Sequence, residues 1–116
     1  MASGGRKLRW DEIKKEPMGE GITRKVIHGK NITLARISVD AGRTVPEHSH
    51  HNEQISYVLE GRLTFNIEGK ISEAAPGDIF VIPPGTMHKV TAREPSVVLD
   101  TFSPPRDDWI KTKDTA

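Results

Sequence analysis

From residue 22 onward the chain is a succession of short runs rich in Ile, Val, Thr and Phe, separated by turns that contain glycine. The turn segments read HGK, AGR, EGR, EGK, APGD and PPGT, a composition that tight turns prefer. Runs of this kind favour short β-strands joined by hairpins. We expect strands over residues 22–28, 31–40, 53–60, 63–68, 70–74, 78–83, 88–92 and 96–103. About eight such strands predict an all-β sandwich or barrel.

The 116 residues suffice for one domain with a single core. We interpret residues 1–19 as an N-terminal extension that is partly disordered, because its first nine residues are rich in glycine and charge. In this extension the segment WDEIKKE either forms one helical turn or packs Trp10 and Ile13 onto the body. Residues 20–103 form the predicted barrel. Residues 104–116 form a C-terminal tail that packs on the barrel, since two consecutive prolines end the last strand.

Charge and composition exclude several classes of function. The 17 basic and 16 acidic residues give a net charge of +1, so no general field attracts nucleic acid or an anionic membrane. The absence of cysteine excludes disulfides, thiolate nucleophiles and zinc sites built from cysteine. No apolar run approaches the roughly 20 residues that span a bilayer, and the N-terminus lacks the apolar core of a signal peptide. We therefore expect a cytoplasmic protein without nucleic-acid or membrane partners.

The segment PEHSHHNEQISYVLEG, residues 46–61, concentrates residues that bind metals. Side chains on a regular strand alternate between faces, so His48, His50 and Gln54 would project together. His51 and Glu53 would then point the other way. This parity selects the amide of Gln54 over the acid of Glu53, although a kink after His50 would reverse the choice. The bland alternative is a group of histidines in an exposed loop, which a lone H-x-H motif does not exclude.

The segment SVVLDTFSPPR, residues 96–106, places Asp100 within an otherwise apolar strand. Asp100 and Phe102 share a face by alternation, and Arg106 follows the two prolines. A buried aspartate either pairs with a cation or titrates unusually, because desolvation raises its pKa. Two interpretations stay open. Asp100 and Arg106 form a structural ion pair that holds the tail, or Asp100 transfers protons and Arg106 binds a carboxylate with two hydrogen bonds.

Two linked motifs resemble those of the cupin superfamily, G-x5-H-x-H-x3-E-x6-G and G-x5-P-x-G-x2-H. The first begins at Gly42 and ends at Gly61, and the second runs from Gly77 to His88. The resemblance implies a double-stranded β-helix, the jelly-roll or cupin barrel, with both motifs at one mouth. It also implies that one divalent transition metal (Zn, Ni, Mn, Fe, Co or Cu) is bound by His48, His50, Gln54 and His88. The sequence departs from the pattern at Gln54, which replaces glutamate, and at Ala92, which stands where asparagine is frequent.

The amide at position 54 has a chemical consequence. A glutamate would lower the charge of a divalent site to +1, whereas an amide leaves it at +2. The more positive site is a stronger Lewis acid and attracts carboxylates. It also donates less electron density, which makes oxidation of the metal harder. The pattern therefore favours non-redox chemistry on a small acidic molecule.

Over nearly its full length the chain resembles one cupin group, the pectin-degradation type that acts on unsaturated uronates. The shared features include H-x-H-x3-Q and an ending D-x-F-x3-R, which here is Asp100, Phe102 and Arg106. The resemblance implies functional roles for these three residues and a small anionic, uronate-like substrate. The implied activity converts a cyclic 4,5-unsaturated uronate from pectin or alginate into its linear 5-keto-4-deoxyuronate form. It further implies a homodimer, to which residues 22–28 and 31–40 contribute.

Two other functions remain as alternatives. One is a metal-dependent cupin dioxygenase acting on a small organic molecule, which would need a redox-active ion and would consume oxygen. The other is a non-catalytic cupin that binds a sugar or a metal. No DNA-binding segment accompanies the predicted barrel, so a regulatory role has no support in the residues.

Overall fold

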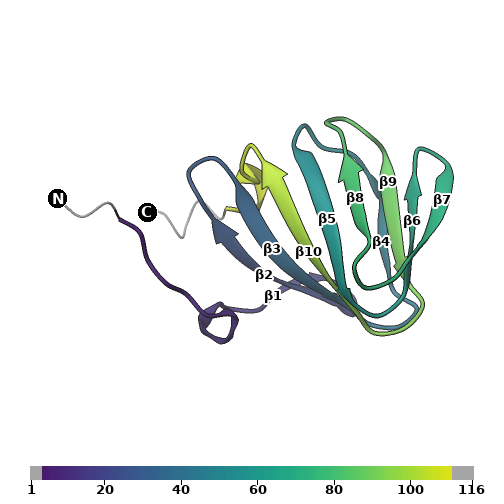
Figure 1. Cartoon of the computed structure of the whole chain (residues 1–116), viewed down its shortest axis with the longest axis horizontal. Coiled ribbons are helices and arrows are strands. Elements are labelled where there is room, and N and C mark those ends of the chain that lie inside the picture. Colours follow the sequence, from purple (N-terminus) through teal and green to yellow (C-terminus); the bar gives the residue numbers. More distant parts are fainter. Residues whose placement is uncertain (1–3, 111–116) are drawn as a thin grey trace.

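Two antiparallel sheets face each other and form the body of the protein (Figure 1). The computed structural model describes residues 4–110. The larger sheet has six strands in the order β1-β2-β3-β10-β5-β8, and the smaller has four in the order β4-β9-β6-β7. The strands are β1 (Glu16–Gly19), β2 (Ile22–His28), β3 (Thr33–Val39), β4 (Thr44–His48), β5 (Glu53–Glu60), β6 (Leu63–Ile67), β7 (Lys70–Ala74), β8 (Ile79–Ile82), β9 (His88–Ala92) and β10 (Ser96–Ser103). The predicted all-β jelly-roll architecture is confirmed.

All eight strands expected from the sequence are present, and the structure adds β1 and β4. Both additional strands contain a proline, Pro17 in β1 and Pro46 in β4, which obscured them in the sequence. Each lies at the edge of its sheet, where a residue without a backbone N–H is tolerated. The six-stranded sheet therefore begins at Glu16, inside the segment interpreted as an extension.

The core follows from strict alternation along the central strands. In β3 and β10 every second side chain is buried between the sheets, and β5 alternates in the same way. Most of these inward residues are aliphatic, and the rings of Phe65 and Phe80 stack with centroids 4.1 Å apart. Toward one end of the sandwich the inward residues become polar. These residues are Thr33, Gln54, Ser56, His88 and Asp100.

The segments before β1 and after β10 each contain one helical turn. Residues 4–9 have no regular secondary structure, and Trp10–Glu12 form the helical turn η1. After β10 the chain passes through Pro104 and Pro105 into a second turn, η2 (Asp107–Trp109). Residues 1–3 and 111–116 of the expected extension and tail lie outside the described residues. Within residues 4–110, neither helical turn is long and apolar enough to cross a membrane.

The start of the tail is fastened to the barrel by hydrogen bonds. The side-chain Nδ2 of Asn52 donates to the carbonyl oxygens of Pro104 and Pro105, at 2.6 and 3.2 Å. The backbone N–H of Arg106 donates to Thr33 Oγ1 at 2.9 Å. Asn52 belongs to the loop between β4 and β5. The tail and this histidine-bearing loop are therefore held together at the polar end of the sandwich.

Candidate metal centre

Three histidines converge at the polar end of the sandwich. His48 ends β4 and His88 begins β9, and the two are paired across the smaller sheet. His50 comes from the loop between β4 and β5. One ring nitrogen from each of the three lies within 4.8 Å of the others. Antiparallel pairing thus brings together histidines that are 40 residues apart in sequence.

Each of the three rings is oriented by a backbone carbonyl two residues away. His48 Nδ1 lies 2.8 Å from the carbonyl oxygen of Pro46, and His88 Nδ1 lies 2.8 Å from that of Thr86. His50 Nδ1 lies 3.1 Å from the carbonyl oxygen of Asn52. A carbonyl only accepts, so each neutral ring donates from Nδ1 and keeps its lone pair on Nε2. This is the arrangement in which metal-binding histidines are commonly held.

Gln54 joins the histidines, and Glu53 does not. The Gln54 side chain is only 5% exposed, whereas Glu53 is exposed to solvent. Gln54 Oε1 lies 2.9 Å from His50 Nε2, and Gln54 Nε2 donates to Ser56 Oγ at 2.9 Å. The placement agrees with the parity prediction, but residues 49–52 form a loop, so no single strand carries His48 and Gln54. The inward direction of Gln54 comes from alternation within β5 alone.

The donor set fits a divalent cation. With Nδ1 protonated, His50 Nε2 and Gln54 Oε1 present two lone pairs to each other at 2.9 Å. Two ligand atoms bound at right angles to one ion, each about 2.1 Å away, lie roughly 3 Å apart. In addition, His88 Nε2 is buried and has no hydrogen-bond partner among the described residues. Three imidazoles and an amide oxygen suit borderline divalent ions.

Burial favours the neutral form of His50 and His88, which is the form that binds metal. Burial lowers the pKa of His88 to about 4, and the carbonyl of Thr86 opposes this shift only in part. Burial, followed by the charge of Arg106, also lowers the pKa of His50. Metal binding requires neutral imidazole. His88 is therefore ready to act as a ligand at neutral pH without the release of a proton.

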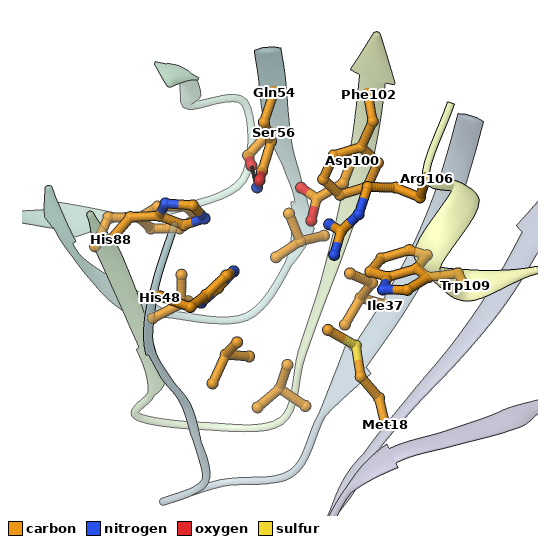
Figure 2. Close-up of a pocket in the computed structure, with 15 residues that line it drawn as sticks. Met18, Ile37, His48, Gln54, Ser56, His88, Asp100, Phe102, Arg106 and Trp109 are labelled. Carbon is orange, nitrogen blue, oxygen red and sulfur yellow. Dashed lines mark hydrogen bonds between the residues drawn. The ribbon is translucent and has the colours of Figure 1, made fainter. Parts of the chain in front are cut away.

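His48 and His88 form one wall of a cavity, and the end of β10 with η2 forms another (Figure 2). Asp100, Phe102, Arg106 and Trp109 lie across the cavity from His48 and His88. The cavity contains about 450 Å³ of empty space including its open mouth. Its remaining lining is mainly aliphatic. Besides Gln54 and Ser56, the remaining residues are Met18, Ile37, Val39, Val45, Phe65, Val90 and Val98.

Asp100 is buried and faces Ser56 across the β5–β10 pairing. Its Oδ1 atom has no hydrogen-bond partner among the described residues. Burial raises the pKa of Asp100 to about 6, while Ser56 and the charge of Arg106 oppose the rise. A carboxyl group with such a pKa exchanges protons readily near neutral pH. The carboxyl is therefore suited to proton transfer at the cavity wall.

Arg106 pairs with Asp108 rather than with Asp100. Its Nε and Nη2 atoms donate to the two carboxylate oxygens of Asp108 at 3.0 and 2.9 Å. Among residues 4–110 no ion pair joins Asp100 and Arg106, so the structural interpretation of that pair does not hold. Sequence reasoning missed this because Asp100 and Asp108 are equally plausible partners until the tail is placed. The guanidinium N–H groups that Asp108 does not engage remain available.

Phe102 lies in the same wall of the cavity as Asp100 and Arg106. Its ring meets the His50 ring edge to face at 5.6 Å, and the Arg106 guanidinium carbon lies 4.7 Å from its centroid. Phe102 therefore shapes and dries the cavity without offering a reactive atom. Two residues that sequence reasoning did not select also belong to the site. Ser56 shares the parity of Gln54, which would have signalled it, whereas Trp109 lies beyond the strands and gave no signal.

The remaining histidines are not part of this centre. His51 is exposed to solvent. His28 lies half-buried on β2, where its Nδ1 is 3.0 Å from Thr33 Oγ1. Both placements agree with their interpretation as ordinary residues.

Comparison with known proteins places this geometry in context. The family described as Cupin_2, cupin domain, matches residues 35–102. The curated pectin degradation protein KdgF of Dickeya dadantii (strain 3937) is 34% identical over 103 residues, which cover 86% of this chain and 94% of that protein. The solved structure of KdgF from Halomonas sp. is 36% identical with a TM-score of 0.87, covering 91% of this chain and 99% of that one. An RmlC-like cupin from Shewanella frigidimarina is 29% identical with a TM-score of 0.87, covering 92% and 97%.

Proposed function

Because this chain belongs to the Cupin_2 family of cupin domains, we propose that it is a metal-dependent enzyme of uronate breakdown. The substrate would be a cyclic 4,5-unsaturated uronate released from pectin or alginate, and the product its linear 5-keto-4-deoxyuronate form. A protein that is similar over most of both chains is named for pectin degradation, which supports this substrate class. The proposal extends that likeness to a defined reaction.

The reaction is an isomerisation. The hydroxyl at carbon 1 loses a proton, the bond between carbon 1 and the ring oxygen breaks, and the former ring oxygen takes up a proton, which gives an aldehyde and an enol at carbon 5. The enol then loses its hydroxyl proton while carbon 4 gains one, which leaves a ketone at carbon 5. Protons move, but no electrons leave or enter the molecule. The chemistry therefore needs acid–base groups and stabilisation of an oxygen, not an oxidant.

One observation carries the proposal: His48 and His88 of the histidine group face the same cavity as Asp100 and Arg106. The site thus combines a place for a cation, a carboxyl group suited to proton transfer and a fixed arginine. A negatively charged sugar acid that must shift protons uses all three. An apolar lining around them excludes water and strengthens each electrostatic contact.

The residues would act as follows. Arg106 binds the substrate carboxylate through N–H groups that Asp108 leaves unengaged, since arginine presents five donors. Asp100 holds and delivers a proton at Oδ1, the atom without a partner among the described residues. Phe102 packs beside both and keeps the sugar at the cavity wall. A divalent ion bound by His48, His50, Gln54 and His88 would supply Lewis acidity toward a substrate oxygen.

The same proposal includes the setting of the enzyme. One divalent ion per chain is expected, drawn from the transition metals that imidazole and amide ligands suit. We expect a homodimer in the cytoplasm that contacts neither nucleic acid nor membrane. The near-neutral charge of the chain supports the expected absence of nucleic-acid and membrane contacts.

The test is direct. Purified protein is incubated with unsaturated galacturonate, and the loss of ultraviolet absorbance from the conjugated double bond is followed against the spontaneous rate. Protein stripped with a chelator and then reloaded with single metals gives the matched comparison. We expect turnover that disappears on stripping and returns with a divalent ion. Absence of turnover with every metal, in protein that binds metal, would refute the proposed activity.

A further inference from the structure

Trp109 contacts two arginines at the rim of the cavity. The guanidinium carbon of Arg106 lies 4.0 Å from the indole centroid, and that of Arg24 also lies 4.0 Å from it. Two guanidinium groups cannot share one face of a ring at this distance, so they lie on opposite faces. The indole edge also meets the Phe102 ring at 5.1 Å. Trp109 is therefore the centre of a stack of Arg24, Trp109 and Arg106, and Figure 2 shows its inner end, where Arg106 and Trp109 line the cavity.

The outer end of the stack is anchored in the larger sheet. Arg24 on β2 faces Glu16 on β1 across the strand pair, and Arg24 Nε donates to Glu16 Oε1 at 3.0 Å. The Arg24 side chain is only 13% exposed, so this contact is partly shielded from water. A guanidinium that is held in this way gives the indole a fixed support. The position of Trp109 thus depends on the barrel as well as on its own short turn.

The inner end of the stack is Arg106, whose plane determines where its free N–H groups point. Asp108 restrains one edge of the guanidinium with two hydrogen bonds, but the Asp108 side chain is 60% exposed, so solvent partly screens this pair. The Trp109 face restrains the plane itself, because arginine stacks on aromatic rings. Both faces of the indole are occupied, so Trp109 is unsuited to stack on a sugar ring.

We propose that Trp109 is a positioning residue: clamped between Arg24 and Arg106, it fixes the Arg106 guanidinium plane that binds the carboxylate of the substrate. This inference rests on the proposed function for the identity of the substrate. It assigns Trp109 a role in binding and none in proton transfer. Loss of Trp109 should weaken binding of the substrate in the ground state and in the transition state equally, which raises KM and leaves kcat unchanged.

The experiment compares Trp109→Phe with Trp109→Leu, both made in a Trp10→Phe background. The reference protein carries Trp10→Phe alone, so Trp109 is its only tryptophan. Steady-state kinetics use unsaturated galacturonate, and calorimetry measures binding of saturated galacturonate, which cannot react. We expect Trp109→Leu to raise KM and the galacturonate Kd about tenfold, the size of a partly desolvated cation–π contact, with kcat within about twofold. Trp109→Phe keeps an aromatic face and should restore most of the affinity.

Two further measurements keep the test decisive if Trp109→Leu folds poorly. Arg24→Lys keeps the charge and the Glu16 partner but lacks a planar group, so it should raise KM by less than Trp109→Leu does. Galacturonate should also change the emission of Trp109, because the anion binds to the arginine on its face. Trp10→Leu is the matched control, since Trp10 lies outside this cavity.

The outcomes separate this inference from the proposed function. Turnover with an unchanged KM in both Trp109→Leu and Arg24→Lys would overturn the role of Trp109 alone. A fall in kcat with KM unchanged would overturn it as well. If the native protein does not turn over unsaturated galacturonate, the proposed function fails. The role of Trp109 is then tested by the affinity for saturated galacturonate and by the emission of Trp109. An unaltered Kd in the Leu variant would end it.

Discussion

Asp100 and His88 face one cavity from opposite sheets, and each has a buried polar atom without a hydrogen-bond partner among the described residues. The atoms are Asp100 Oδ1 on β10 and His88 Nε2 on β9. Buried polar atoms in native proteins are almost always satisfied, and each exception calls for an explanation. Here both exceptions lie where a metal ion and a substrate would contact the protein. The following predictions address the two sides of the cavity.

The first prediction concerns metal occupancy. The double substitution His48→Ala with His88→Ala should abolish divalent metal in purified protein, because two of the four expected ligands are lost. Circular dichroism should remain rich in β-structure, since the apolar core does not use these side chains. Metal content is measured by mass spectrometry, with His51→Ala as the control. Full metal retention in the double variant would remove the site assignment.

The second prediction concerns the amide ligand. Gln54→Glu keeps the side chain in its buried position and adds a negative charge beside His50. Metal affinity should hold or rise, while uronate turnover should fall because the site becomes less positive and repels the substrate carboxylate. In a dioxygenase, the more electron-rich ion should instead react with oxygen as well or better. Metal titration, uronate absorbance and oxygen uptake are measured together.

Glu53→Gln is the matched control for this change, because Glu53 neighbours Gln54 but is exposed. It should leave both metal affinity and turnover at native levels. If Glu53→Gln impairs turnover and Gln54→Glu does not, Glu53 carries the site and the placement of Gln54 is irrelevant to function.

The third prediction concerns the proton-transfer role of Asp100. Asp100→Asn keeps the shape of the side chain but cannot ionise. Turnover should fall by about 10²-fold or more, the usual contribution of a positioned acid–base group. KM should change little, because Arg106 still binds the carboxylate. A variant that retains native turnover would exclude Asp100 from catalysis.

The fourth prediction follows from the raised pKa of Asp100, which burial moves from 3.8 to about 6. A folded-state pKa above the unfolded value means that the fold favours the protonated form. That stabilisation is complete below pH 4 and is lost as the pH rises toward 6, to an extent of up to about 3 kcal/mol. Urea unfolding of metal-stripped protein should therefore show Asp100→Asn gaining stability relative to the native chain between pH 4 and pH 7. A constant difference across this range would contradict the shift.

The fifth prediction concerns assembly. Light scattering at micromolar concentration should give twice the 12.9 kDa mass of the chain. Leu34→Lys places a charge on the outer face of β3, within the expected interface, and should shift the mass toward the monomer. Ile71→Lys is the control, because Ile71 is 66% exposed on β7 in the other sheet. A monomeric native protein would contradict the expected dimer.

The sequence by itself determined eight of the ten strands and the turns between them, because these depend on local rules. Alternation fixes which side chains of β5 and β10 point inward, so Gln54 and Asp100 could be selected without coordinates. The glycine pattern has the same local origin. Gly61 has a φ of 90°, a turn conformation that favours glycine, whereas the collision of a Cβ there with Ser96 and Pro95 arises only in the folded chain.

Only the tertiary structure decided which groups are partners. β1 and β4 form strands because each pairs with one neighbouring strand at the edge of its sheet, where a proline is tolerated. No local pattern in the sequence shows this pairing. The choice of Asp108 over Asp100 as the partner of Arg106 depends on where the tail returns to the barrel. The stack of Arg24, Trp109 and Arg106 joins β2 to the tail in the same way. Contacts between segments distant in sequence have no periodic signal along the chain, since they arise only when the sheets bring those segments together.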